Sequence, residues 1–166
     1  MSHEAIRIRE IRAEDNPQVE AVIKNCFKDF GLPTVGTAYE DAETPFMNEA
    51  YSEDRAVYFV VENGLEILGG AGIKQLKDYE GNVCELQKMY FSSKLRGQGF
   101  GKKLMSKCLE AAKDFGYEQV YLETIPTLEA AIHIYEEFGF KHRTEPLGNT
   151  GHYSCGIWMT KDLKQE

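Results

Sequence analysis

The nine residues RGQGFGKKL, from 96 to 104, form the part of the sequence best suited to binding a ligand. Glycine occurs at 97, 99 and 101, and the basic side chains of Arg96, Lys102 and Lys103 flank these positions. Glycine lets a ligand approach the backbone closely and adopts positive φ readily. The apolar pattern that follows predicts a helix, whose free N–H groups and positive dipole end favour an anion. The segment therefore predicts a phosphate-binding loop.

Two well-known phosphate loops do not fit this spacing. The dinucleotide fingerprint G-x-G-x-x-G fails because Lys102 stands where its last glycine is required. The P-loop G-x-x-x-x-G-K-[ST] fails because Arg96 replaces its first glycine and Lys103 its Ser or Thr. The pattern that fits is R-x-x-G-x-G over residues 96–101, between a predicted strand and a predicted helix.

Glu85 is the candidate for acid–base chemistry, because it lies in the middle of the predicted central strand over 83–91. A carboxylate there would be buried, which is costly unless it has a partner or a purpose. The alternative to a chemical role is a strand carboxylate paired to a neighbour.

The elements that must position these residues follow from hydrophobic periodicity and turn signals. Helices are expected between the Asp15-Asn16-Pro17 start signal and Gly31, after the glycine loop as far as Phe115, and over 128–138, with a short helix near 44–52. Strands are expected at 5–12, 56–62, 65–77, 83–91, 117–124, 139–145 and 152–160. This order predicts one α/β domain over residues 1–166: a mixed, mostly antiparallel sheet of six to seven strands with helices on both faces.

Charge and composition exclude several classes of function. The formal net charge of −8 argues against nucleic-acid binding. The apolar run 56–61 is far shorter than the roughly 20 residues of a membrane span, and the first residues lack a signal-peptide core, so no membrane and a cytoplasmic location are expected. The cysteines at 26, 84, 108 and 155 and the histidines at 3, 133, 142 and 152 form no recognised ligand spacing, so no metal is expected.

The segment CELQKMYFSSKLRGQGFGKKLM resembles the central strand and pyrophosphate loop of the GNAT superfamily of acyl-CoA-dependent N-acyltransferases. YLETIPTLEAAIHIYEEFGFK resembles the next strand of that family and its tyrosine-bearing helix, and GIWMTKDL its last strand. The resemblance is strong across 83–141, weak before 56, and implies the GNAT fold.

The resemblance also implies where acetyl-CoA, the acyl donor, would bind. Backbone N–H groups of the loop would hold its pyrophosphate, the strand end would bind its pantetheine arm, and the Met89 N–H would polarise the thioester carbonyl. The residues implied are Met89, Tyr90, Phe91, Arg96, Gly97, Gln98, Gly99, Phe100, Gly101, Lys102, Thr127 and Tyr135. Many family members carry an asparagine after the strand 117–124. This chain has Thr127 nearby instead, which could cap the following helix and contact the donor.

By the same resemblance, Glu85 occupies the position of a base that acts through water, and Tyr135 that of a tyrosine acting on the CoA sulfur. For Tyr135, packing in the core is the alternative interpretation. His133 is expected to be exposed, and His152 is a candidate contact to the acceptor.

The expected function is transfer of an acetyl group from acetyl-CoA to a primary amine of a small molecule or peptide by direct attack. A non-catalytic CoA-binding sensor or interaction domain is the alternative, and a nucleotide-binding module is disfavoured by the failed templates. The stretch 29–54 holds seven acids and no base, including Glu40, Asp41, Glu43 and Glu49, and predicts a cationic acceptor. Homodimers are common in the family, but no interface is legible in the sequence.

Overall fold

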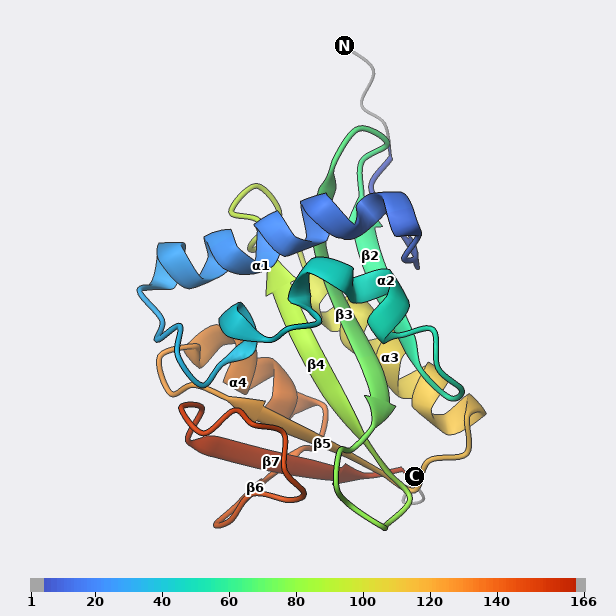
Figure 1. Ribbon diagram of the computed structural model, residues 1–166, viewed down its shortest axis with the longest axis vertical. Coiled ribbons are helices and arrows are strands. Elements are labelled where there is room, and N and C mark those ends of the chain that lie inside the picture. Colours follow the sequence, from blue (N-terminus) through green and yellow to red (C-terminus); the bar gives the residue numbers. More distant parts are fainter. Residues whose placement is uncertain (1–4, 164–166) are drawn as a thin grey trace.

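Seven strands form one sheet in the computed structural model, which describes residues 5–163 (Figure 1). In chain order they are β1 (Arg7–Glu10), β2 (Val57–Glu62), β3 (Ile67–Gln75), β4 (Val83–Phe91), β5 (Gln119–Thr124), β6 (Lys141–Arg143) and β7 (Ile157–Asp162). The ends of the domain expected over 1–166, together with His3, lie outside the described residues.

The strands lie in the order β1-β2-β3-β4-β5-β7-β6. Every neighbouring pair is antiparallel except β4 and β5, which confirms the predicted mixed, mostly antiparallel sheet. Parallel neighbours require a crossover connection, and the helix α3 (Phe100–Asp114) lies between β4 and β5 in the chain.

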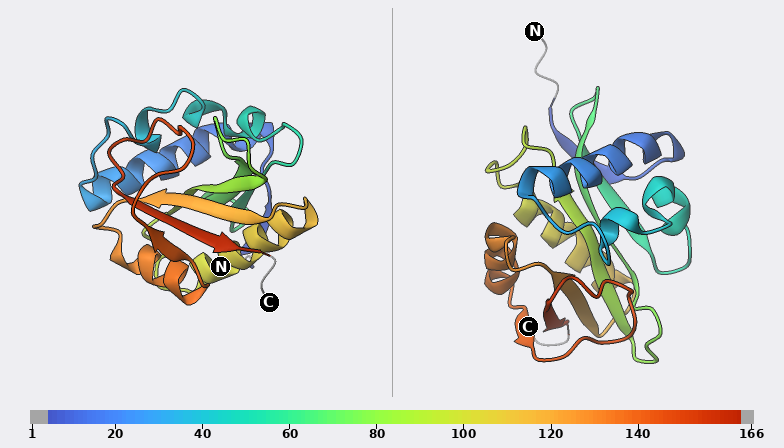
Figure 2. Two further views of the ribbon diagram at one scale, coloured as in Figure 1. Left: turned by 90° about the horizontal axis from the view of Figure 1, so that it is seen from below. Right: turned by 60° about the vertical axis from the view of Figure 1, so that its left-hand side comes forward.

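Helices cover both faces of the sheet, as predicted (Figure 2). On one face lie α1 (Asn16–Phe30) and α2 (Met47–Ala50), and on the other α3 and α4 (Glu129–Glu137). Side chains of β2 alternate between the two cores, with Tyr58 and Val60 in the first core and Val57, Phe59 and Val61 in the second. Because both faces are buried, residues 57–61 of this strand are all apolar or aromatic, and its one charged residue is Glu62 at the end.

Short 3-10 turns complete the described elements: η1 (Ala13–Asp15), η2 (Ala38–Glu40) and η3 (Thr44–Phe46). The expected short helix near 44–52 is therefore η3 followed by α2. All four cysteines are free and buried, as small apolar side chains would be. His133 is exposed as expected, with 73% of its side chain accessible. Among residues 5–163, no helix has both the length and the hydrophobicity needed to cross a bilayer.

Two local predictions were wrong. The last strand begins at Ile157 rather than at 152, because Gly148, Gly151 and Gly156 adopt positive φ and interrupt an extended chain. Thr127 does not cap α4, whose N-cap position is Leu128. The Leu128 N–H donates to the Ile125 carbonyl at 3.0 Å, so the chain completes a turn after Thr127 before the helix begins.

Candidate active site

The two parallel strands separate after three residue pairs. Val83, Cys84 and Glu85 of β4 pair with residues 119–121 of β5, and the pairing then ends. The ribbons of β4 and β5 diverge from this point (Figure 1). We call the space between residues 86–91 and 122–124 the wedge. On the side that faces the wedge, the backbone N–H and C=O groups of both strands have no partner strand. A ligand rich in amide groups could hydrogen-bond to them.

A β-bulge at Lys88 bends β4 beside the wedge. Lys88 has a φ of 51°, and the register with β3 shifts between Gly70 and Gly72. A bulge of this kind bends its strand and re-aims the neighbouring side chains. The Tyr58 hydroxyl donates to the Lys88 carbonyl at 2.8 Å, which holds the bulge from the side of β2.

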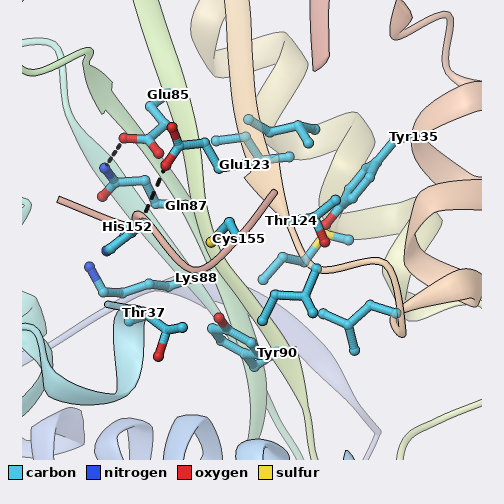
Figure 3. A pocket seen from close by; sticks show the side chains of 16 residues that line it. Thr37, Glu85, Gln87, Lys88, Tyr90, Glu123, Thr124, Tyr135, His152 and Cys155 are labelled. Atoms are coloured by element: carbon cyan, nitrogen blue, oxygen red, sulfur yellow. Dashed lines mark hydrogen bonds and ion pairs between the residues drawn. The ribbon is translucent and has the colours of Figure 1, made fainter. Parts of the chain in front are cut away.

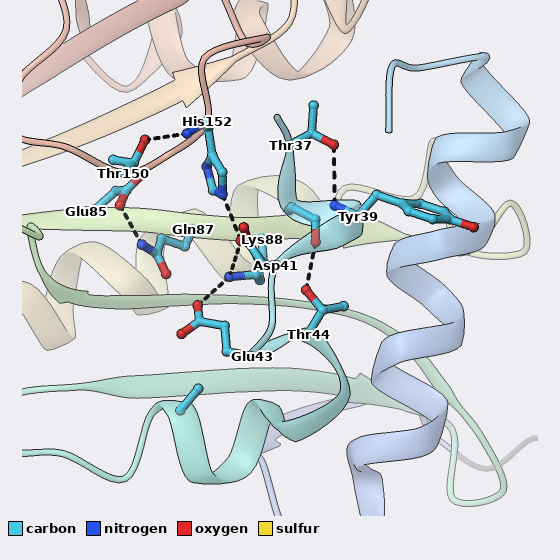
Figure 4. Close-up of polar contacts among 12 residues, drawn as sticks. Thr37, Tyr39, Asp41, Glu43, Thr44, Glu85, Gln87, Lys88, Thr150 and His152 are labelled. Carbon is cyan, nitrogen blue, oxygen red and sulfur yellow. Dashed lines mark hydrogen bonds and ion pairs between the residues drawn. The ribbon is translucent and has the colours of Figure 1, made fainter. Parts of the chain in front are cut away.

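The Lys88 side chain ties this bulge to the loop before α2. This side chain is 1% exposed, and its ammonium lies 3.1 Å from the Asp41 carboxylate and 2.5 Å from that of Glu43 (Figure 4). Lys74 lies 2.7 Å from the other oxygen of Glu43. A buried ammonium is stable only when it is paired in this way. The long segment between α1 and β2 is therefore fixed against the central strand.

The glycine loop borders a cavity of about 460 Å³ that reaches into the wedge. Gly97 and Gly99 have φ values of 81° and 80°, the left-handed conformation for which glycine is preferred. Gly99 is also the N-cap residue of α3, and no side chain caps the helix there. The predicted donor-binding residues that line this cavity are Met89, Tyr90, Phe91, Arg96, Gly97, Gly99, Phe100, Gly101, Lys102, Thr127 and Tyr135.

Gln98 and Arg96 are held by bonds within the protein. The Gln98 amide donates to the Lys94 carbonyl at 2.8 Å. The Arg96 guanidinium donates to the Phe91 carbonyl at 2.9 Å and pairs with Asp29 at 3.1 Å. Arg96 therefore links the end of β4 to α1 at the edge of the cavity. Lys103 is exposed on the surface.

A second, smaller cavity of about 50 Å³ lies deeper in the wedge, and Glu85, Glu123, His152 and Cys155 line it (Figure 3). Met89, Tyr90, Leu128 and Tyr135 line both cavities. The two cavities therefore meet beside Met89 and Tyr135. One ligand could reach this junction from the glycine loop and another from the opposite side.

Glu85 is 2% exposed, and the Gln87 amide donates to its carboxylate at 2.5 Å. The Tyr51 hydroxyl in turn donates to Gln87 at 2.5 Å, so the carboxylate is held in place. Burial raises the pKa of Glu85 to about 7. No cation forms an ion pair with it among residues 5–163, but the bond from Gln87 means that both interpretations, a catalytic base and a strand carboxylate paired to a neighbour, fit its surroundings.

The position of Tyr135 is compatible with both interpretations made from the sequence. Its ring packs edge-on against Phe140 at 6.1 Å between centroids and belongs to the core beneath α4. It also lies at the junction of the two cavities. Burial raises the pKa of the Tyr135 hydroxyl, so the hydroxyl keeps its proton.

His152 lines the smaller cavity, where its predicted role as an acceptor contact would place it. Its Nε2 lies 2.7 Å from the Asp41 carboxylate and its Nδ1 lies 3.8 Å from that of Glu123. Burial lowers the pKa of His152, but the hydrogen bond and charge of Asp41 outweigh burial and raise the pKa overall. Glu123 was not identified from the sequence. The signal that identified Glu85, an acid within an apolar strand, is also present at Glu123.

The acid-rich stretch 29–54 does not face the wedge as a group. Glu40 accepts from the Gly36 N–H at 2.6 Å, and Glu49 accepts from the Asn16 amide at 2.9 Å. Asp41 and Glu43 are near the site, but Lys88 and Lys74 pair with them. Glu40 and Glu49 line neither cavity, so they do not support the prediction of a cationic acceptor that was made from this stretch. The buried carboxylates that line the deeper cavity are Glu85 and Glu123.

The raised pKa of Glu85 predicts a stability that depends on pH. Its folded pKa of about 7 exceeds the ordinary value of 4.5, so the folded state holds the proton more tightly. Stability is then lost as the pH rises from about 4.5 to 7, by on the order of 3 kcal/mol. We expect Glu85→Gln to raise the free energy of unfolding by about that amount at pH 8 and by much less at pH 5, in urea denaturation.

The charged and titratable groups that face Glu85 come from the end of α2, from β4, from β5 and from the loop before β7. They are Tyr51, Lys88, Tyr121, Glu123, His152 and Cys155. Glu66→Gln is the control, because Glu66 is an exposed acid that pairs with Lys94. It should give no gain at pH 8. An equal effect of Glu85→Gln at both pH values would contradict the raised pKa.

An α/β sheet that opens between its one parallel pair, with a glycine loop at the mouth of the opening, is the architecture of the GNAT N-acyltransferases. The acetyltransferase (GNAT) family pattern matches residues 12–140. The uncharacterized N-acetyltransferase YjgM of Escherichia coli (strain K12) is 38% identical over 157 residues, covering 94% of each chain. The chain belongs to the GNAT family and is an N-acyltransferase.

More distant relatives agree with this assignment. The probable N-acetyltransferase family 8 member 5 of Mus musculus is 32% identical over 130 residues, 77% of this chain and 52% of that protein. A GNAT acetyltransferase from Staphylococcus aureus Mu50 has a TM-score of 0.83 at 21% identity, over 96% of this chain and 100% of that chain. A Salmonella typhimurium protein solved with acetyl-CoA has a TM-score of 0.74 at 17% identity, over 98% and 96% of the two chains. The structures confirm the predicted fold.

Proposed function

We propose that the chain is one acetyltransferase domain that transfers the acetyl group of acetyl-CoA to a primary amine of a small molecule or peptide, by direct attack while both substrates are bound. The observation that carries the proposal is the junction of two cavities inside the wedge. One cavity leads to the glycine loop, the other to a buried carboxyl, and Met89 and Tyr135 border both.

The larger cavity suits the donor. The N-terminus of α3 carries no side-chain cap, so its first N–H groups and the positive φ of Gly97 and Gly99 form a cradle for a diphosphate. From the loop, the unpaired edge of β4 leads toward Met89. A pantetheine arm has amide groups that can bond to such an edge as an added strand would. The thioester would then lie beside Met89 and Tyr135.

The deeper cavity suits the amine. Direct transfer forms a bond from the amine nitrogen to the carbonyl carbon and breaks the carbon–sulfur bond. The nitrogen must lose a proton, and Glu85, with a pKa of about 7, is a suitable acceptor for it through one water. The Met89 N–H stabilises the negative oxygen that develops on the carbonyl.

Tyr135 assists the departing sulfur. A thiolate with an ordinary pKa of about 8.5 is a weaker base than a buried phenolate, so full proton transfer from the tyrosine is unfavourable. A hydrogen bond from the hydroxyl to the sulfur stabilises its charge without that transfer. The expected contribution is therefore modest.

The carboxyls of Glu85 and Glu123 support an acceptor that is cationic in water. Both line the deeper cavity, and Glu123 is 4% exposed at its side chain. Burial strengthens their attraction for a positive group. An anionic acceptor would meet repulsion from both.

An acceptor screen tests the proposed function. Release of CoA from acetyl-CoA would be followed with monoamines, diamines, amino acids and peptides, each against an amine-free control. We expect one class of primary amine to raise the rate well above hydrolysis. Binding of acetyl-CoA without release for any amine would instead support a non-catalytic CoA-binding domain, and a strongly anionic best acceptor would contradict the predicted charge preference.

Tyr135→Phe is expected to lower kcat about tenfold to a hundredfold, with little change in the KM for acetyl-CoA. The change removes only the hydroxyl, so the ring contact with Phe140 survives. Steady-state kinetics with the best amine measure the effect. Tyr117→Phe is the control, because its hydroxyl bonds to the Arg55 carbonyl at 2.8 Å away from the wedge. An unchanged kcat in Tyr135→Phe would show that Tyr135 contributes only to core packing.

A further inference from the structure

The deeper cavity brings together one nitrogen, one sulfur and one oxygen donor. His152, Cys155 and Glu123 each offer a ligand atom, and these atoms lie within 4.8 Å of one another. Glu123 comes from β5 and the other two from the loop before β7 (Figure 3). From this geometry we propose that the three residues form a binding site for Zn²⁺ or a similar borderline-soft divalent cation in the acceptor half of the wedge.

The local backbone supports this arrangement. His152 and Cys155 have H-x-x-C spacing, and the Cys155 N–H donates to the His152 carbonyl at 3.3 Å. This turn brings the two side chains to the same side of the loop. Short spacings of this kind are typical of His and Cys ligands to zinc. The expectation of no metal rested on the absence of a C-x-x-C pair and of a ligand spacing among the histidines, and this mixed pair is neither.

Neighbouring groups orient two of the three ligands. The Nε2 of His152 lies 2.7 Å from Asp41 (Figure 4). The Nδ1 is therefore the nitrogen that faces Glu123. The Tyr121 hydroxyl donates to the Glu123 carboxylate at 2.6 Å, and the Thr150 hydroxyl donates to its other oxygen. Metal-binding histidines and carboxylates in proteins commonly have outer partners of this type.

The contact between His152 and Glu123 leaves room for an ion. The Nδ1 lies 3.8 Å from the Glu123 oxygen, beyond hydrogen-bond distance. Zinc bond lengths of about 2.0–2.3 Å imply ligand–ligand distances of roughly 3.3–3.6 Å around a tetrahedral ion. Side-chain movements of about 1 Å would therefore close the three ligands around the metal. A fourth position would remain open toward the cavity.

The chemistry of the ligand set selects the ion. A thiolate favours Zn²⁺ or Co²⁺ over Mg²⁺ and Ca²⁺, which prefer oxygen ligands. Binding releases the thiol proton of Cys155 and, where the imidazole is protonated, that of His152. No oxidation or reduction is involved. An ion here would occupy the cavity assigned to the amine, so it would compete with the acceptor.

Titration with Co²⁺ tests the site without either substrate. We expect one equivalent of Co²⁺, added to the reduced full chain, to produce the charge-transfer absorption of a cobalt–thiolate bond, and Zn²⁺ to abolish it. Cys155→Ser should remove this band. Cys26→Ser is the matched control, since Cys26 is 5% exposed and Cys155 7%, and it should keep the band.

Glu123→Gln provides a second variant that retains the thiol and the shape of the side chain. It should weaken Zn²⁺ binding by roughly 10–100-fold in calorimetry. Absence of the band in the wild type, its persistence in Cys155→Ser, or its loss in Cys26→Ser would overturn the proposal.

Inhibition by Zn²⁺ tests the competition, which rests on the proposed function. Zn²⁺ should inhibit acetyl transfer competitively with the amine in the wild type and much less in Cys155→Ser. Inhibition competitive with acetyl-CoA alone would contradict the placement of the ion in the acceptor half. A chain that binds Co²⁺ through Cys155 but transfers no acetyl group would refute the proposed reaction and leave the metal site standing.

Discussion

Glu85→Gln is expected to lower kcat/KM for the best amine about 10²–10⁴-fold at pH 8, the usual contribution of a general base. Glutamine keeps the size of the side chain and can still accept the hydrogen bond from Gln87. It cannot accept a proton from the attacking amine. The KM for acetyl-CoA should change little, because the donor cavity and the glycine loop are untouched.

The pH profile separates loss of a base from loss of structure. In the wild type, kcat/KM should rise with pH through about 7, where Glu85 ionises, and the rise should flatten or shift in the variant. Glu66→Gln is the control, because Glu66 pairs with Lys94 and lines neither cavity. It should keep the wild-type pH profile. A wild-type rate and profile in Glu85→Gln would show that positioning alone accounts for the reaction.

Gly99→Ala is expected to weaken acetyl-CoA binding about 10–100-fold with little change in kcat. At this residue φ is 80°, and an added Cβ would meet no protein atom within 4 Å. The methyl group would enter open space at the edge of the larger cavity, which Gly99 lines and where we propose that the diphosphate binds. Loss of one or two charge-assisted hydrogen bonds is worth about 1.5–3 kcal/mol. Calorimetric titration with acetyl-CoA measures the effect.

Backbone strain must be separated from the loss of ligand contacts. Gly116→Ala is the matched control, because Gly116 follows the other end of α3 with a φ of 84° and also has open space around it. Both variants should lose about 1–2 kcal/mol of stability from the left-handed conformation. Only Gly99→Ala should lose affinity. Gly101 is less suitable, since its Cβ would lie 3.1 Å from Ile134 and disturb packing. Equal affinity in the two variants would contradict the loop assignment.

Several features of the protein could be predicted because local sequence determines them. The apolar period of 83–91 predicted β4 with its observed bounds, and Gly31 predicted the end of α1, where it adopts a φ of 61°. The spacing of glycines after β4 indicated the loop, because φ and close backbone approach depend on the residues themselves. The resemblance to the family then pointed to Glu85 and Tyr135, which the fold places near one junction.

Other features were decided only by tertiary structure. The wedge exists because β4 and β5 lose their pairing after Glu85, beside a bulge at Lys88 that is held by Tyr58 and by acids more than forty residues earlier in the chain. Glu123 and His152 become neighbours through the final loop, whose course depends on glycines in left-handed conformations. Hydrophobic periodicity reports which face of a strand is buried, but it does not report which distant carboxylate will pair with a buried lysine. Those contacts depend on the register and separation of the strands. Register and separation are in turn determined by the packing of the whole chain.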